Sequence, residues 1–161
     1  MFLVALFFFC GGETVRSSLH DLVITNNPLV ARCLPETYSV QLWEQLNYEQ
    51  ILIKVRDCVY AGHRLYTHPL AGSVKPNETP YRSVVISRTG EDFSCDDAAL
   101  IASAIETFGK FTPRHRELTE EMLWDFQLVD YSLLCAALEI DPLEGLHHKN
   151  ETNYRTRRCS L

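Results

Sequence analysis

The 161-residue sequence lacks the features by which many nucleotide-binding enzymes and metal proteins are recognised. It contains no glycine-rich phosphate loop of either common kind, and no Gly-x-Ser-x-Gly elbow surrounds Ser73. The six cysteines form no Cys-x-x-Cys pair, and no set of four Cys and His residues has zinc-ligand spacing. We therefore expect reduced thiols in a cytoplasmic protein that binds no metal and no cofactor, with zinc binding through cysteine or through His147 and His148 as the alternative.

Positive charge is scarce as well. Lysine and arginine together number 15 against 21 aspartate and glutamate residues, which gives a formal net charge of −6 at pH 7. The dense basic run at residues 155–158 lies at the C-terminus, where a frayed tail is the simpler explanation. Proteins that bind nucleic acid usually carry a basic stripe, so we expect no nucleic-acid partner.

Long hydrophobic runs are limited to the first residues of the chain. Residues 1–9 are almost wholly apolar, but they are too few to span a bilayer as a helix. A secretory signal requires a basic segment before such a run and a small-x-small cleavage site after it, and both are missing. We interpret residues 1–20 as an atypical N-terminal extension, with an export signal as the alternative, and we expect no membrane association.

What the sequence does contain is the composition of one globular domain. Its hydrophobic and charged fractions, 46% and 22%, are ordinary for such a domain. A chain of this length buries one substantial core. We therefore place a single domain at residues 21–141 and a polar tail at residues 142–161.

Hydrophobic periodicity and end signals predict alternating strands and helices. Strands are expected at residues 22–25, 38–42, 64–67 and 83–87. Helices are expected from Pro28 to before Pro35, over residues 48–61, from Ser94 to Gly109, and from Thr119 to before Pro142. This order predicts an α/β fold, a small three-layer sandwich with a short, mostly parallel four-stranded sheet.

Two polar segments directly follow predicted strands. Thr25, Asn26 and Asn27 end the first strand, and Thr67 and His68 end the strand at residues 64–67. In open α/β sheets, ligands gather outside the carboxyl ends of the strands. If these two strands are parallel and adjacent, the two segments meet at one edge of the sheet and share a pocket.

The second polar segment belongs to a long loop, residues 62–81, which we call the site loop. Prolines at positions 69, 76 and 80 prevent a regular element, while apolar residues at 70, 74 and 81 anchor the loop. A loop of this length in a compact domain is usually functional or disordered, and its apolar anchors favour function. The candidate ligand-binding residues are Thr25, Asn26, Asn27, His63, Arg64, Thr67, His68, Ser73, Lys75, Asn77 and Glu78.

The chemistry of these residues favours a small anion. A helix that begins at Asn27 and Pro28 offers free amides to a phosphate, an acyl phosphate or a carboxylate. Arg64 and Lys75 add positive charge to the same site. His68 is the candidate acid or base, because histidine exchanges a proton near neutral pH.

Each of these features also has a simpler structural explanation. The pair Asn26 and Asn27 serves equally well as a helix cap. A histidine near a strand end is more often packed or exposed than catalytic. An exposed Lys75–Glu78 pair contributes only about 0.5 kcal/mol. We expect the apolar stripe of the last helix to lie in the hydrophobic core. The alternative is that it contacts a second copy of the chain in a homo-oligomer.

Several separated blocks of the sequence resemble one family. They are Ile-Thr-Asn-Asn-Pro at 24–28, Ile-Lys-Val-Arg-Asp at 53–57, Gly-His-Arg-Leu at 62–65, Thr-His-Pro-Leu-Ala-Gly-Ser-Val-Lys-Pro-Asn-Glu-Thr-Pro-Tyr at 67–81, and Asp-Phe-Gln-Leu-Val-Asp at 125–130. Together these blocks look like the GrdX family, small proteins encoded beside the glycine, sarcosine and betaine reductase genes of amino-acid-fermenting anaerobic bacteria. The resemblance covers roughly residues 22–138.

The resemblance implies a cytoplasmic accessory protein of a selenium-dependent, thioredoxin-linked reductase that makes acetyl phosphate. Together with the polar residues above, it leads us to expect an assembly, regulatory or small-anion-binding role. The expected partners are reductase components or an anion such as phosphate, acyl phosphate or carboxylate. No catalytic residues are carried over with the family. The alternative is a small enzyme that acts on an acyl phosphate or an amino-acid-derived anion, with His68 as acid or base and with Arg64 and Lys75 orienting the anion.

Overall fold

A computed structural model describes residues 21–70, 72, 75–90, 92–111 and 117–146. The regular elements, in chain order, are β1 Asp21–Thr25, α1 Pro28–Cys33, β2 Ser39–Leu42, α2 Tyr48–Tyr60, β3 Ser83–Ser87, α3 Cys95–Gly109 and α4 Glu120–Ala137. These elements confirm the predicted helices and three of the four predicted strands, with boundaries that differ by a few residues at most. The expected extension at residues 1–20 lies outside the described residues.

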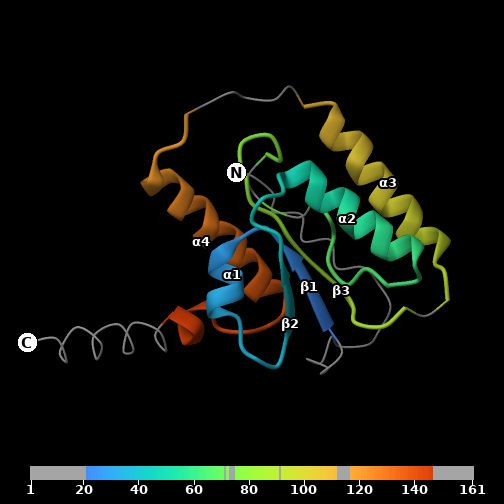
Figure 1. Cartoon of the computed structure of the whole chain (residues 1–161), viewed down its shortest axis with the longest axis horizontal. Helices are drawn as coiled ribbons and strands as arrows, with labels where there is room; N and C mark the ends of the chain where they lie inside the picture. The colour runs from blue at the N-terminus through green and yellow to red at the C-terminus, as the bar shows by residue number, and fades with distance from the viewer. Residues whose placement is uncertain (1–20, 71, 73–74, 91, 112–116, 147–161) are drawn as a thin grey trace, which may run out of the picture.

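The three strands form one mixed sheet with the order β2-β1-β3 (Figure 1). β1 pairs with β2 in parallel, and β1 pairs with β3 antiparallel. The prediction of a mostly parallel sheet of four strands was therefore wrong. The antiparallel pairing places the start of β3, at Ser83, opposite the end of β1, at Thr25.

The predicted strand at residues 64–67 runs beside β3 but forms only one bridge, between Leu65 and Ile86. Beyond that bridge, the backbone N–H of Val85 donates to the side-chain Oγ1 of Thr67, over 2.9 Å. The Thr67 side chain thus accepts the hydrogen bond that a backbone carbonyl would accept in a continuous β-ladder. Pro69, two residues later, has no N–H to donate to such a ladder. The fourth strand fails to form for this reason.

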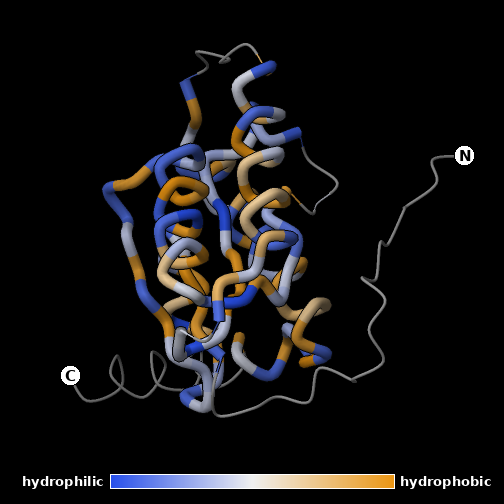
Figure 2. The backbone as a smooth tube through the Cα atoms, turned by 90° about the vertical axis from the view of Figure 1, so that its right-hand side faces the viewer, coloured by the Kyte–Doolittle hydropathy of each residue, from blue (hydrophilic) through white to orange (hydrophobic). Residues whose placement is uncertain are grey.

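Helices cover both faces of the sheet, as expected for a three-layer sandwich (Figures 1 and 2). On one face, alternate strand residues such as Ile24 and Ile86 pack against α2 and α3. On the other face, Val23 and Val85 pack against α1 and α4. Side chains alternate between the two faces along a strand, so strands covered on both sides must be apolar throughout.

Side-chain caps define where the helices begin. Asn27, Asn47, Ser94 and Thr119 each accept a hydrogen bond from a backbone N–H in the first turn of α1, α2, α3 and α4, respectively. Pro28 follows at the first position of α1, where its missing N–H costs nothing. The cap expected at Asn27 and the helix starts expected at Ser94 and Thr119 are therefore confirmed.

The beginning of the expected polar tail is packed against the domain. Residues 142–146 form a short helical turn, and Leu146 contacts the core cluster beneath α1 and α4. A Cβ atom at Gly145 would collide with the carbonyl oxygen of Cys33 and the hydroxyl of Tyr131. Only glycine allows the chain to pass so close to the end of α1.

We predict that truncating either side of the sandwich destabilises the fold. Ile86→Ala on the α2–α3 side and Leu134→Ala on the α1–α4 side each remove a buried side chain. Each should lower the free energy of unfolding by about 2–5 kcal/mol, as measured by urea denaturation. Leu143→Ala, at a residue that is 55% exposed, is the control and should change it by no more than about 0.5 kcal/mol. A loss confined to one side would contradict the three-layer arrangement.

Candidate functional site

The carboxyl ends of β1 and β2 and the start of β3 meet at one edge of the sheet, which we call the carboxyl edge. Six polar residues are buried there: Thr25, Asn26, Asn27, Arg82, Ser83 and Asp130. Buried polar groups need hydrogen-bond partners, because an unsatisfied one costs about 1–3 kcal/mol. The bonds between these residues therefore determine how the edge is built.

Asp130, on the inner face of α4, is the acceptor at the centre of one half of this network. Its carboxylate accepts hydrogen bonds from the backbone N–H of Ser83 (3.0 Å), the Ser83 hydroxyl (2.7 Å) and the Asn27 amide (2.9 Å). The hydroxyls of Ser83 and Thr25 lie 2.7 Å apart and share another hydrogen bond. The carboxylate thus ties α4 to the end of β1 and to the start of β3.

Asn26 and Arg82 form the other half, which we call the clamp. The backbone N–H of Arg82 donates to Oδ1 of Asn26, and Nδ2 of Asn26 donates to the carbonyl oxygens of Pro80 and Leu46, all over 2.8 Å. The Arg82 guanidinium donates to the carbonyl oxygen of His68, over 2.7 Å. The chain segment 68–80 is thereby fastened at both ends, at His68 by Arg82 and at Pro80 by Asn26.

The clamp brings together the two polar segments that the sequence singled out. Asn26 and His68 lie on either side of Arg82, at the same end of the sheet. The strands before these segments were expected to be adjacent, but residues 64–67 lie along the side of β3 that faces away from β1. The two segments nevertheless meet at this end of the sheet. Arg82, which the sequence reading did not select, is the residue that connects them.

Asn27 makes the contacts of a structural cap. Its Oδ1 accepts the N–H of Leu29 at 2.9 Å, and its own N–H donates to the Thr25 hydroxyl at 2.9 Å. Its Nδ2 also donates to the carbonyl oxygen of Gln127, besides Asp130. The side chain is fully buried, so these contacts give the capping explanation direct support.

His68 is exposed, and its ring is oriented by the loop itself. The backbone N–H of Leu70 donates to Nδ1 of His68, over 3.1 Å. In the neutral ring the proton is then on Nε2, which makes Nε2 a donor. Partial burial, and next the positive charge of Arg82, lower the pKa of His68 below its usual 6.5. At neutral pH the ring is therefore uncharged and presents an N–H.

His63 and Arg64 lie at the opposite end of β3 from His68. Nδ1 of His63 donates to the carbonyl oxygen of Ser87 at 2.7 Å. Nε of Arg64 pairs with the Asp97 carboxylate at the start of α3 at 2.6 Å, and the N–H of Leu65 donates to the same oxygen. Since Ser87 pairs with the first residue of β1, these two candidates do not join the carboxyl edge.

The remaining candidates lie on the site loop. Thr67 is committed to β3 through its hydroxyl. Lys75 is exposed, and its carbonyl oxygen accepts the N–H of Glu78 in a turn, with Asn77 and Glu78 half-buried. Ser73 lies outside the described residues, so its candidacy stays a prediction.

The sequence reading missed Arg82, Ser83 and Asp130. A signal for Asp130 was present, because it lies three residues after Gln127 and four before Leu134, on the face of α4 that points to the core. A carboxylate in such a stripe needs partners, and the hydroxyl-rich end of β1 supplies them. Arg82 gave no comparable signal, since it directly precedes the strand without any periodic pattern.

A shallow groove with a volume of about 500 Å³ lies beside the carboxyl edge, between α1, the end of β2 and the first turns of α4. Its lining includes Arg32, Glu44, Glu120, Trp124 and Gln127. Within the described ranges, no group of three His, Cys, Asp or Glu side chains is arranged to hold a metal ion. In the same part of the chain, no helix has the length and apolar character needed to cross a membrane.

We predict that Asp130→Asn destabilises the protein. The new amide group can accept fewer of the three hydrogen bonds and places an NH₂ group against donors, so the free energy of unfolding should fall by about 1–3 kcal/mol. Asp125→Asn removes the same charge from an exposed position of α4 and should change it by no more than about 0.5 kcal/mol. Equal effects of the two variants in urea denaturation would contradict the role assigned to Asp130.

We also predict the protonation behaviour of His68. Its folded pKa lies below its unfolded value, so the folded state binds the proton less readily. The stabilisation linked to the neutral ring is complete above pH 6.5 and is lost as the pH falls through the folded pKa. Histidine NMR titration should show this lowered pKa, with the Nε2–H form in the neutral state. A pKa at or above 6.5, or an Nδ1–H form, would rule this out.

The family model of GrdX-like proteins matches residues 22–139, a span from β1 to the end of α4 that includes the clamp and Asp130. No curated protein and no solved structure matches the chain. Because the family model covers well over half of the sequence, the chain belongs to the GrdX-like protein family.

Proposed function

We propose that the chain is an accessory protein of the glycine/betaine reductase system and that residues 68–80, the clamped loop, contact a reductase component. The observation that carries this proposal is the clamp, in which Asn26 and Arg82 hold both ends of the loop. Compact surface loops whose ends lie close together are frequently functional. A loop held in one shape before binding loses less conformational entropy when a partner docks.

The contacts of the polar residues favour binding over catalysis. Thr25, Asn27 and Ser83 are buried and bonded to protein groups, so their side chains hold the edge together. His68 and Lys75 are exposed on the clamped loop and are available to a partner. The Nε2–H of a neutral His68 and the ammonium of Lys75 are donors, which suits carboxylates on a partner protein or a small anion.

Membership of the GrdX-like family supports the choice of partner. It fits an association with glycine reductase genes, and proteins encoded together often act together. A regulatory or assembly role then follows more naturally than a separate metabolic reaction. A second ligand for the same donors is a small anion such as phosphate, acyl phosphate or carboxylate.

A small enzyme with His68 as acid or base is the second candidate. The lowered pKa of His68 favours it, because the ring is uncharged at neutral pH. The hydrogen bond from Leu70 counts against a general base, since it occupies the Nδ1 lone pair. Arg64, expected to orient the anion, lies at the other end of β3. The accessory role is therefore the stronger proposal.

We expect exposed loop residues to contribute to binding of purified reductase components. Biolayer interferometry with the immobilised full chain should show binding that weakens by about tenfold in the double variant His68→Ala/Lys75→Ala. Lys110→Ala, at an exposed lysine in the C-cap position directly after α3, is the matched control and should bind like the wild type. If no reductase component binds, or if the control loses as much affinity, the proposal fails.

The small-anion version has its own test. A thermal-shift panel of phosphate, acetyl phosphate, glycine and betaine should raise the melting temperature with at least one anion, and His68→Ala/Lys75→Ala should abolish the shift. A flat response across the panel would remove the anion and leave the protein contact as the role of the clamped loop.

A further inference from the structure

Helix α4 is apolar on two opposite sides. Its inner side, which includes Tyr131, Leu134 and Leu138 at its C-terminal cap, packs on the sheet. An outer stripe, which we define as Met122, Phe126, Val129 and Leu133, runs along the side facing away from the core. A surface helix normally has one apolar side, and a helix that is apolar all round is normally buried.

The outer stripe remains partly open in the described structure. Val129 and Leu133 are 37% and 36% exposed, and Met122 and Phe126 are half-buried. The stripe repeats at steps of four, three and four residues, the spacing with which one helix packs along another. The principal neighbours of α4 are α1 and β3, and both lie on its inner side.

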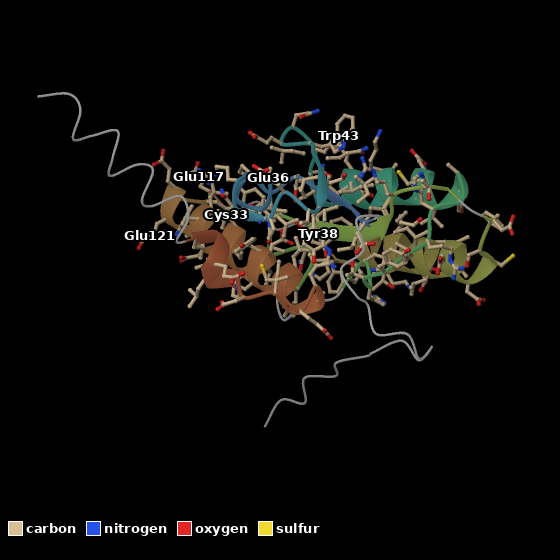
Figure 3. The ribbon with its side chains drawn as sticks, turned by 90° about the horizontal axis from the view of Figure 1, so that it is seen from below. Cys33, Glu36, Tyr38, Trp43, Glu117 and Glu121 are labelled. Carbon is tan, nitrogen blue, oxygen red and sulfur yellow. The ribbon has the colours of Figure 1, made fainter. Side chains whose placement is uncertain are left out.

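The charged side chains that α4 itself and the residues next to it carry are all acidic. Residues 117–146 contain no lysine, arginine or histidine, and seven of their acidic residues are exposed: Glu117, Glu120, Glu121, Asp125, Glu139, Asp141 and Glu144. Figure 3 shows Glu117 and Glu121 near each other at the start of α4, at one end of the molecule. A partner that packs on the stripe must therefore meet a negative rim.

We propose that the outer stripe of α4 is a docking surface for an amphipathic helix of a partner protein, with apolar residues at helical spacing and lysine or arginine beside them. The apolar side of such a helix covers Val129 and Leu133, and its basic flanks meet Glu121 and Asp125. A second copy of this chain is disfavoured in a parallel pairing of two α4 helices, because that pairing opposes Glu121 and Asp125 of one copy to the same residues of the other. An anionic membrane surface is disfavoured by the same charges.

The stripe adjoins the clamped loop. A Cβ atom at Gly72 would lie 3.3 Å from Cδ1 of Leu133, so the loop passes against the end of the stripe. The Gln127 amide also donates to the Tyr81 hydroxyl at 3.0 Å. One partner can therefore touch both surfaces, but the inference rests on α4 alone and holds whether or not that partner is a reductase component.

Two synthetic peptides test the proposal. Both carry leucine at the a and d positions of a helix, and they differ only in lysine or glutamate at the flanking e and g positions. In fluorescence anisotropy at about 0.15 M salt, the full chain should bind the lysine peptide about tenfold more tightly than the glutamate peptide. Val129→Gln/Leu133→Gln should weaken that binding by about tenfold. Phe93→Gln, at an exposed aromatic residue outside α4, should leave it unchanged.

A charge-reversed variant separates specific docking from general attraction to an acidic protein. Glu121→Lys/Asp125→Lys leaves the stripe intact and should shift the preference toward the glutamate peptide. The proposal is overturned if Val129→Gln/Leu133→Gln binds like the wild type, or if Phe93→Gln weakens binding equally. It is also overturned if light scattering shows a dimer that Val129→Gln/Leu133→Gln dissociates, because the stripe then joins two copies of the chain.

Discussion

The antiparallel entry of β3 beside β1 is the constraint on which the rest of this structure depends. It places Arg82 and Ser83 against the carboxyl end of β1, where they form hydrogen bonds with Asn26 and Thr25, respectively. A polar group buried at such a junction costs free energy unless it finds a partner. Asp130 completes the set from α4, so the sheet, the last helix and the site loop are fixed by one hydrogen-bonded network.

Much of the fold was predictable because it depends on local signals. Asn27 followed by Pro28 marks the start of α1, and the run of apolar residues in β3 requires cover on both faces. The direction of β3 was not predictable, since a strand buried on both faces has the same apolar sequence pattern in a parallel and in an antiparallel sheet. The candidate site suffered from the same limit. Asn26 and His68 do meet, but they meet through Arg82, which only the three-dimensional arrangement reveals.

The two surfaces proposed for binding arise from the same architecture. In the clamp, buried polar groups of Asn26 and Arg82 hold the two ends of a surface loop. Such contacts are expected where the shape of a loop matters for binding. The inner face of helix α4 packs in the core and contributes Asp130 to the network. The helix also has a second apolar side, which acidic residues flank. Both surfaces support the accessory role proposed above, in which the protein contacts partners.

Native-state hydrogen exchange of the Arg82 and Ser83 amides tests the central claim most directly. Those amides donate to the side chains of Asn26 and Asp130, respectively. If the network holds the carboxyl edge, both amides should exchange as slowly as the ladder amides of β3, because exchange then requires global unfolding. Exchange at the rate of the exposed turn around Lys75, with β3 still protected, would show that the edge opens independently and that no such network fixes it.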